Sequence, residues 1–302
     1  MPLSDIALTA AQRGSLLSLQ DTQALSERTQ TRLTTGKKIN SVVDDAVNFF
    51  RAKALSDRAE DFSLRKDNID QGISALNSTL QAIESIDALV KQMKGIVEAS
   101  RSQSTQERQA ATTQFEEVGT QIFQLIEDAS YQGLNLLSNT NAVLDVAFGV
   151  RTASRLTVTG LDLNETDGDA VNGLFSVGVF SANGQNINIS NFGLSGGSFT
   201  SYGSANSNVG FANDMITVID KSISRLRGHA STLGSNVAIL QTRLDFTNTY
   251  VNELSTGSDK LTLADLNEEG ANLVALQTRQ QLGIQSLSIS GQQQQAILSL
   301  LQ

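Results

Sequence analysis

The sequence contains no cysteine, no tryptophan, one histidine and one proline in 302 residues. Without cysteine the chain has no disulfide, no thiolate metal site and no thiol nucleophile. The single histidine, His229, excludes a metal centre built from several histidines. The only proline is Pro2, so the 300 residues after it contain none of the residue that most strongly breaks a helix. This absence favours very long helices.

Large side chains and positive charge are also scarce. Aromatic residues make up 5% of the chain and hydrophobic residues 39%, which is low for a compact enzyme of this length. The net charge of −9 repels nucleic acid and anionic lipid, so we expect neither as a partner. No apolar run approaches the roughly 18 residues of a membrane span. Met1–Gln20 lacks the features of a cleaved secretory signal, and we expect none.

Residues 216–254 carry a long helical repeat of apolar side chains. The repeat positions follow in steps of three and four, and eleven of twelve are apolar, where the composition predicts about five. A repeat of more than five heptads is typical of a coiled-coil-like helix. Its positions are Ile216, Ile219, Ile223, Leu226, Ala230, Leu233, Val237, Leu240, Leu244, Thr247, Val251 and Leu254.

The N-terminal half contains two matching apolar stripes, separated by short polar stretches. Three such stripes predict a mainly α fold, in which long antiparallel helices from both ends of the chain form a coiled-coil-like bundle. The first stripe comprises Ile69, Ile73, Leu76, Leu80, Ile83, Ile86, Val90, Met93 and Val97, and the second Phe115, Val118, Ile122, Leu125 and Ala129.

The two outermost segments, 1–40 and 265–302, are compatible with helix but poor in apolar side chains and rich in Gln, Ser and Thr. Neither is expected to hold a helix alone in water. They are either disordered tails in the free monomer or segments that become ordered only when other subunits pack on them. Their sparse apolar residues are Leu3, Ile6, Leu16, Leu17 and Leu25 on one side and Leu282, Ile284, Leu287, Ile297 and Leu301 on the other.

The composition changes between residues 138 and 210, where Gly, Asn and Ser dominate. Leu156 and Val158 suggest one strand. An alternating run from Phe175, the Asn183-Gly184 turn and a second alternating run through Ile189 predict a β-hairpin. We expect a small β-rich surface insertion with a loop near 193–208, and we expect assembly to survive deletion of about 145–205.

A serine-hydrolase pattern occurs in this insertion. Gly193–Gly197 reads G-x-S-x-G around Ser195, and Asp214 or Asp220 and then His229 follow in hydrolase order. The chemistry needs the serine on a strained strand-to-helix turn within reach of the histidine. Ser195 instead lies in a Gly/Ser/Asn-rich stretch and His229 on the predicted long helix, so we expect no catalytic site.

An acidic cluster also lacks the spacing of a known site. Asp162, Asn164, Asp167 and Asp169 do not fit the twelve-residue calcium loop, because no glycine stands sixth and no glutamate twelfth. We interpret this cluster as a solvated turn and expect neither a metal nor a cofactor.

Residues 32–46 read Arg-Leu-Thr-Thr-Gly-Lys-Lys-Ile-Asn-Ser-Val-Val-Asp-Asp-Ala. This stretch resembles the N-terminal signature of the bacterial flagellin family. Physically, Gly36 permits a turn between two helices, and Asn40 or Ser41 can cap the second one. The signature residues are Arg32, Leu33, Gly36, Lys37, Ile39, Asn40, Ser41, Asp44, Asp45 and Ala46.

The C-terminal segments 280–289 and 297–301 resemble the C-terminal signature of the same family, and Tyr131–Leu137 is similar to the segment that closes its N-terminal helical region. The resemblance covers about 1–137 and 211–302. The chain departs from the family at 47–50, where it reads Val-Asn-Phe-Phe rather than Gly-Leu-Ala-Ile, and it lacks the usual C-terminal Pro and closing Arg. The C-terminal motif residues are Gln280, Gln281, Leu282, Gly283, Leu298 and Leu301.

The resemblance implies a structural protein rather than an enzyme, exported unfolded by the flagellar type III apparatus and assembled into the extracellular flagellar filament for motility. Residues 1–40 with 265–302 would be inner-tube helices, 41–137 with 211–264 an outer-tube bundle, and 138–210 a β-rich surface domain. Its partners would be further copies of itself, an export chaperone, the cap and the hook-junction proteins. A repeated, non-closing contact between unlike surfaces generates such a helical polymer.

Two other functions stay open at this level. The hook–filament junction protein shares this architecture and length class, although the full C-terminal signature favours flagellin. A surface adhesin that binds a glycan through the insertion would need an aromatic platform, for which 138–210 offers only phenylalanines and Tyr202.

Overall fold

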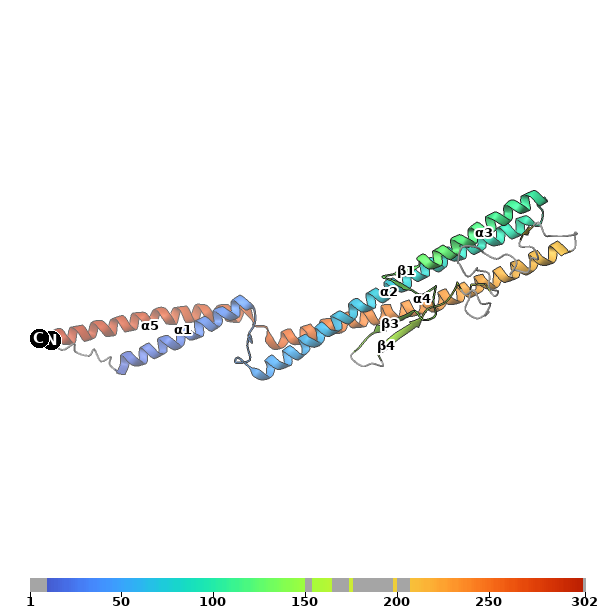
Figure 1. Cartoon of the computed structure of the whole chain (residues 1–302). Helices are drawn as coiled ribbons and strands as arrows, with labels where there is room; N and C mark the ends of the chain where they lie inside the picture. The colour runs from blue at the N-terminus through green and yellow to red at the C-terminus, as the bar shows by residue number, and fades with distance from the viewer. Residues whose placement is uncertain (1–9, 150–153, 165–173, 176–197, 200–206, 301–302) are drawn as a thin grey trace. The chain divides into compact units, whose positions relative to one another are not determined.

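The computed structural model describes residues 10–149, 154–164, 174–175, 198–199 and 207–300. These residues form five α-helices and two small antiparallel sheets (Figure 1), which confirms the expected mainly α fold. The chain divides into two compact units, residues 1–60 with 250–302 and residues 61–249. The three-part division expected from the sequence stays a prediction. The helices are α1 (Ala10–Thr35), α2 (Ala46–Ser100), α3 (Thr105–Asp128), α4 (Ser207–Thr262) and α5 (Leu266–Leu300).

The core of the second unit lies where α2, α3 and α4 turn their apolar stripes toward one another. Every repeat position named above is buried or half-buried. Ile86, Val90, Phe115, Ile122 and Leu240 are fully buried within one continuous apolar cluster. Since full burial of such a side chain contributes about 1.5–3 kcal/mol, these stripes are the main source of stability in this unit.

Both ends of α3 are closed by side chains. At its start Ser104 and Glu107 form a capping box, and the backbone N–H of Ser104 holds the pKa of Glu107 below its usual value. At its end Asn135 donates through Nδ2 to the carbonyl oxygens of Ile126 (2.7 Å) and Glu127 (3.1 Å). Asn135 reaches these carbonyls from a tight hairpin formed by β1 (Ser130–Tyr131) and β2 (Leu134–Asn135). The segment 131–137 therefore terminates α3.

A second hairpin packs against α2. Its strands are β3 (Val143–Ala147) and β4 (Arg155–Thr159), in antiparallel register with Val146 opposite Leu156. The strand expected around Leu156 and Val158 is therefore present. Val146 and Val158 point inward and are buried. Gly72 on α2 makes room for the hairpin, because a Cβ there would lie 2.6 Å from Val146 Cγ2.

Described residues of the insertion contribute to the core, which the sequence did not predict. Phe148, Leu163, Leu174, Phe175 and Phe199 belong to the same buried cluster as the helix stripes. Alternation within the insertion could not reveal these contacts, because their partners lie on distant helices. Deleting 145–205 would remove these side chains from the core, and the survival of assembly after that deletion stays a prediction.

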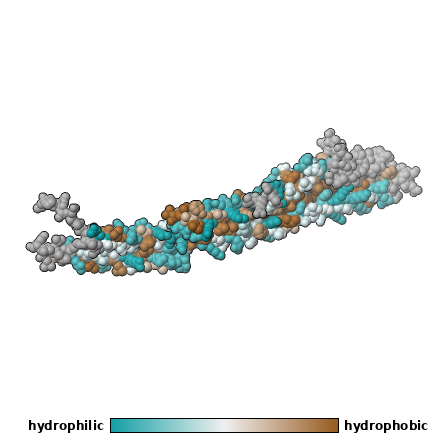
Figure 2. All heavy atoms as spheres, turned by 90° about the horizontal axis from the view of Figure 1, so that it is seen from below, coloured by the Kyte–Doolittle hydropathy of each residue, from teal (hydrophilic) through white to brown (hydrophobic). Residues whose placement is uncertain are grey.

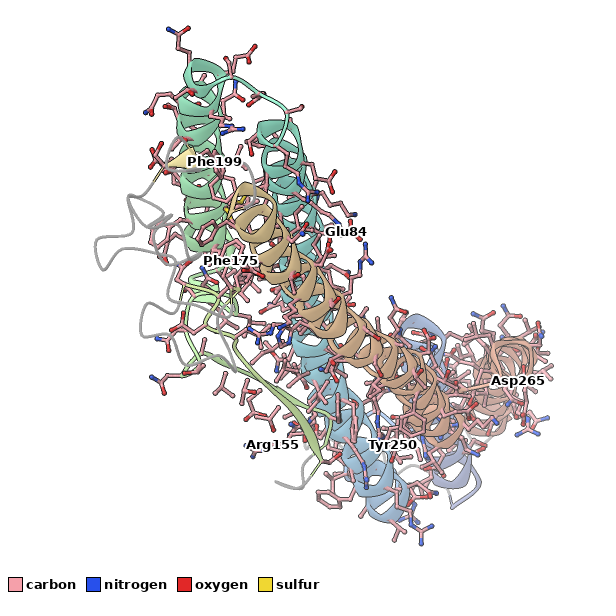
Figure 3. The ribbon with its side chains drawn as sticks, turned by 90° about the vertical axis from the view of Figure 1, so that its right-hand side faces the viewer. Glu84, Arg155, Phe175, Phe199, Tyr250 and Asp265 are labelled. Carbon is pink, nitrogen blue, oxygen red and sulfur yellow. The ribbon has the colours of Figure 1, made fainter. Side chains whose placement is uncertain are left out.

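Phe199 illustrates this packing and lies beside α3 in Figure 3. Its ring meets that of Phe115 edge-on, with centroids 5.5 Å apart, and its backbone N–H donates to Thr112 Oγ1 at 3.0 Å. Apart from Phe175, the hairpin expected within 175–189 lies outside the described residues. Of the loop expected near 193–208, only 198–199 and the first residues of α4 are described.

The helix stripe predicts that a charged substitution destabilises the protein much more at one of two neighbouring positions of α4 than at the other. Leu240→Asp places an unpaired carboxylate in the core and should lower the free energy of unfolding by about 3–5 kcal/mol. Ile239→Asp, at a position 43% exposed, should change it by less than about 1 kcal/mol. Urea unfolding of the monomers, followed by circular dichroism, measures both. Equal stability of Leu240→Asp and the parent would refute the assignment of the stripe. A substitution at His229 should change the free energy of unfolding only slightly.

A parallel pair of variants tests whether the β3–β4 hairpin is part of the core. Val146→Asp should destabilise the monomer by several kcal/mol, because Val146 is buried against Gly72. Val143→Asp in the same strand should have little effect, since Val143 is 44% exposed. Thermal unfolding of the two monomers compares them directly. If both variants have the same melting temperature as the parent, the hairpin is a separable surface element.

Candidate assembly surface

The N-terminal signature forms the turn between α1 and α2. α1 ends at Thr35, and Gly36 follows with a φ of +70°, a conformation that favours glycine. The Gly36 N–H donates to the Arg32 carbonyl at 2.8 Å, which closes the last turn of α1. Gly36 therefore makes the turn expected of it.

The two connections between helices hydrogen-bond to each other. The Lys38 N–H donates to the Thr262 carbonyl at 2.6 Å, and the Ala264 N–H donates to the Gly36 carbonyl at 3.0 Å. Ile39 is buried beside them. Chain segments more than 220 residues apart are thus joined where α1 leads into α2 and α4 leads into α5.

Asp44 organises the loop that follows. Its Oδ2 accepts the backbone N–H groups of Asn40 and Ser41, both at 3.0 Å, and the Ser41 hydroxyl at 3.1 Å. The N–H of Asn40, and then that of Ser41, hold the pKa of Asp44 below its usual value, because they stabilise the charged form.

The cap of α2 is Asp45, and the expectation that Asn40 or Ser41 caps this helix is wrong. Asp45 Oδ1 accepts the Asn48 N–H at 3.0 Å, and this hydrogen bond lowers the pKa of Asp45. The helix begins only at Ala46, which is exposed, so Asn40 and Ser41 stand too far upstream. The Asp-Asp pair of the signature therefore serves two roles, first ordering the loop and then starting the helix.

α1 and α5 lie side by side and antiparallel (Figure 1). Near the connections, Arg32 of the signature donates through Nη1 to Glu269 Oε1 at 2.7 Å, and both side chains are largely shielded from solvent. Leu33 beside it is half-buried. Sequence reasoning missed Glu269, because no local pattern links residues 237 positions apart.

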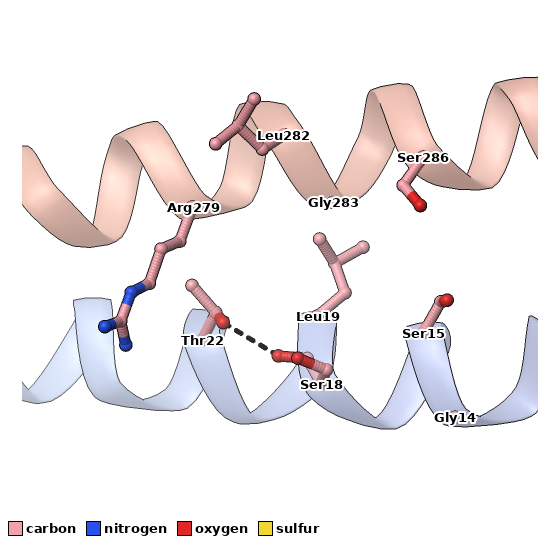
Figure 4. Close-up of a pocket in the computed structure, with 9 residues that line it drawn as sticks. All are labelled: Gly14, Ser15, Ser18, Leu19, Thr22, Arg279, Leu282, Gly283 and Ser286. Atoms are coloured by element: carbon pink, nitrogen blue, oxygen red, sulfur yellow. Dashed lines mark hydrogen bonds between the residues drawn. The ribbon is translucent and has the colours of Figure 1, made fainter.

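The C-terminal signature lies on the same pair of helices. Gln280 Nε2 donates to Gln23 Oε1 at 2.8 Å. A Cβ at Gly283 would come within 2.9 Å of Leu19 Cδ1, so glycine lets α1 approach here. Gln281 is exposed. A groove of about 690 Å³ opens between the helices beside Gly283 (Figure 4). Leu301 and the side chain of Leu298 lie outside the described structure.

This helix pair leaves large apolar side chains in solvent, unlike the buried stripes of α2, α3 and α4. Figure 2 shows brown apolar spheres among hydrophilic ones over α1 and α5 on the face that it views. Leu282 is 63% exposed although it belongs to the C-terminal signature. The exposed apolar residues of the pair, here called the apolar face, are Leu17, Leu25, Leu266, Val274, Leu282, Ile284 and Ile289.

The described residues of the hydrolase pattern do not form a catalytic arrangement. His229 is half-buried in a groove beside β4, where burial, and then the charge of Arg225, lower its pKa. Asp220 Oδ1 instead accepts a hydrogen bond from Lys94 Nζ at 2.7 Å. Ser195 lies outside the described residues, as do Asp167 and Asp169 of the acidic cluster.

Within the part of the chain that is described, no group of His, Cys, Asp or Glu could hold a metal ion, and no helix is long and apolar enough to cross a membrane.

The chain resembles known proteins over nearly its whole length. It is 28% identical over 303 residues to "Flagellin FljM" of Caulobacter vibrioides, covering 99% of both chains, and 27% identical over 295 residues to "Flagellin" of Brucella melitensis, covering 97% of this chain and 96% of the relative. A flagellar hook-associated protein of Vibrio parahaemolyticus has a similar fold, with a TM-score of 0.56 at 16% identity, covering 73% of this chain and all of the other.

Two family regions match the chain in the order expected from the signatures. The bacterial flagellin N-terminal helical region matches residues 7–142, which include α1, α2, α3 and the Asp45 cap. The bacterial flagellin C-terminal helical region matches residues 216–301, which include most of α4 and all of α5. Together they cover well over half of the chain and the whole of the described α1–α5 pair. The protein therefore belongs to the bacterial flagellin family.

Proposed function

We propose that this flagellin, a structural subunit of the extracellular flagellar filament, joins its neighbours through the apolar face of α1 and α5. The observation that carries the proposal is the contrast between the two parts of the chain. The stripes of α2, α3 and α4 are buried within one subunit, whereas the α1–α5 pair keeps seven large apolar side chains in solvent. Neighbouring subunits are the partners that can cover them in a homopolymer.

The energetics favour coupling of order to assembly. Fixing one residue costs on the order of 1–2 kcal/mol of backbone entropy, while full burial of a large apolar side chain contributes about 1.5–3 kcal/mol. With so few apolar side chains, α1 and α5 stabilise each other weakly when they are alone. Burial of the apolar face against other copies supplies the missing contribution, so these segments become firmly ordered at the growing end of the filament.

The contact between copies is heterologous in this proposal, because unlike faces of the helix pair meet and the contact repeats without closing. In this proposal residues 1–40 with 265–302 are the inner tube, 41–137 with 211–264 the outer tube, and 138–210 the variable domain. Export of an unfolded chain by the type III apparatus fits the weak order of the ends. We assign an export chaperone, the filament cap and the hook-junction proteins as further partners.

Limited proteolysis tests this account with two arginines. Trypsin should cut the monomer at Arg279 on α5 but not at Arg227 on α4, although both side chains are exposed, because the buried stripe holds α4 in place. In filaments Arg279 should become resistant, together with the rest of 1–40 and 265–302.

Mass spectrometry of the fragments identifies the cleavage sites, and electron microscopy confirms that filaments are present. The proposal fails if Arg279 resists cleavage equally in the monomer and in the filament, because the ends would then be fully ordered without neighbours.

A further inference from the structure

A second pocket between α1 and α5 concentrates positive charge. Its volume is about 290 Å³, and its lining contains Arg28, Arg32 and Arg279 but a single acid, Glu269. The remaining walls are Leu25, Thr29, Asn272, Ala275 and Leu276. This positive cluster stands out in a chain whose total net charge is −9.

The two helices themselves are balanced in charge, which makes the clustering more informative. α1 and α5 together contain the arginines 13, 28, 32 and 279 and the acids Asp21, Glu27, Glu268 and Glu269. All but one of the arginines line the pocket, whereas all but one of the acids lie outside it and are exposed. The pair therefore presents a positive pocket and a separate set of exposed carboxylates.

The charges in the pocket are incompletely neutralised. Glu269 pairs with Arg32, and among the described residues neither Arg28 nor Arg279 forms an ion pair. Asp44, in the loop after α1, is a more distant negative neighbour of Arg28. In addition, Arg32 Nε is shielded from solvent and has no hydrogen-bond partner in the subunit. A shielded N–H without an acceptor is costly, and a carboxylate is the acceptor that guanidinium groups bind best.

We propose that this pocket binds an acidic side chain of a second copy of the chain. The short aliphatic stem of that Asp or Glu packs against Leu25 and Leu276, and its carboxylate accepts hydrogen bonds from the guanidinium groups. The exposed Asp21 and Glu268, which make no ion pair within the described residues, show that the chain displays carboxylates suited to this role. The inference rests on the proposed self-assembly and adds a polar contact to it. Such a contact sets the register between copies, which an apolar face alone specifies poorly.

The test measures the critical concentration for elongation of sheared filament seeds by purified monomer. Arg279→Gln should raise this concentration about tenfold, because charged pairs at interfaces carry coupling energies of that order or more. Arg279→Lys retains the charge and should stay close to the parent. Arg13→Gln is the matched control, since it removes the same charge from an exposed position of α1 outside the pocket.

Salt dependence provides a second readout that a loss of packing would not change. Sodium chloride raised from about 50 to about 500 mM should reduce the ratio of the critical concentration of Arg279→Gln to that of the parent, because salt screens the contact that only the parent makes. The melting temperature of the Arg279→Gln monomer should match that of the parent. If Arg279→Gln elongates seeds like the parent at every salt concentration, or if Arg13→Gln is equally impaired, the pocket has no such role and the proposed function stands. If the parent itself forms no filaments, the proposed function fails, and this inference fails with it.

Discussion

The rest of the structure depends on the burial of apolar stripes against one another by helices from opposite ends of the chain. α2 and α4 are each more than 50 residues long. An isolated helix gains too little from its own hydrogen bonds to be stable, so most helical stability in proteins comes from packing of an apolar face. Here each helix supplies the face that the other requires, with α3 and the inward side of the insertion covering the remainder. The absence of proline after residue 2 leaves these helices uninterrupted.

The α1–α5 pair follows a different principle. Its contacts within the subunit include polar ones, such as the Arg32–Glu269 ion pair and the Gln23–Gln280 hydrogen bond, and seven of its large apolar side chains face solvent. Polar contacts of this kind contribute little net stability but define which faces meet. The pair is therefore poorly stabilised by itself and suited to partners that bring apolar surface. The hydrogen bonds between residues 36–39 and 262–264 connect the end of α1 to the start of α5.

The signature residues have distinct local tasks that a motif match does not separate. Gly36 ends α1, Asp44 organises the loop, Asp45 starts α2 and Arg32 reaches across to α5. The Val-Asn-Phe-Phe stretch after Ala46 takes part in this arrangement, because Asn48 donates to Asp45 both through its backbone N–H and through its side-chain Nδ2, the latter at 2.8 Å. Phe50 and Val47 are exposed there, which adds apolar surface near the turn.

Periodicity in the sequence determined the long helices and the residues that they bury, because the period of a helix directly orders its side chains around the axis. The family resemblance and the strand around Leu156 were also readable from the chain alone. The cap of α2 could not be assigned from the sequence, because Asn40, Ser41 and Asp45 have the same capping chemistry. Only the observed start of α2 identifies Asp45. The Arg32–Glu269 pair, the ring contact between Phe115 and Phe199 and the arginine pocket join residues far apart in sequence. Such contacts leave no local periodic signal, so only the tertiary structure decided them.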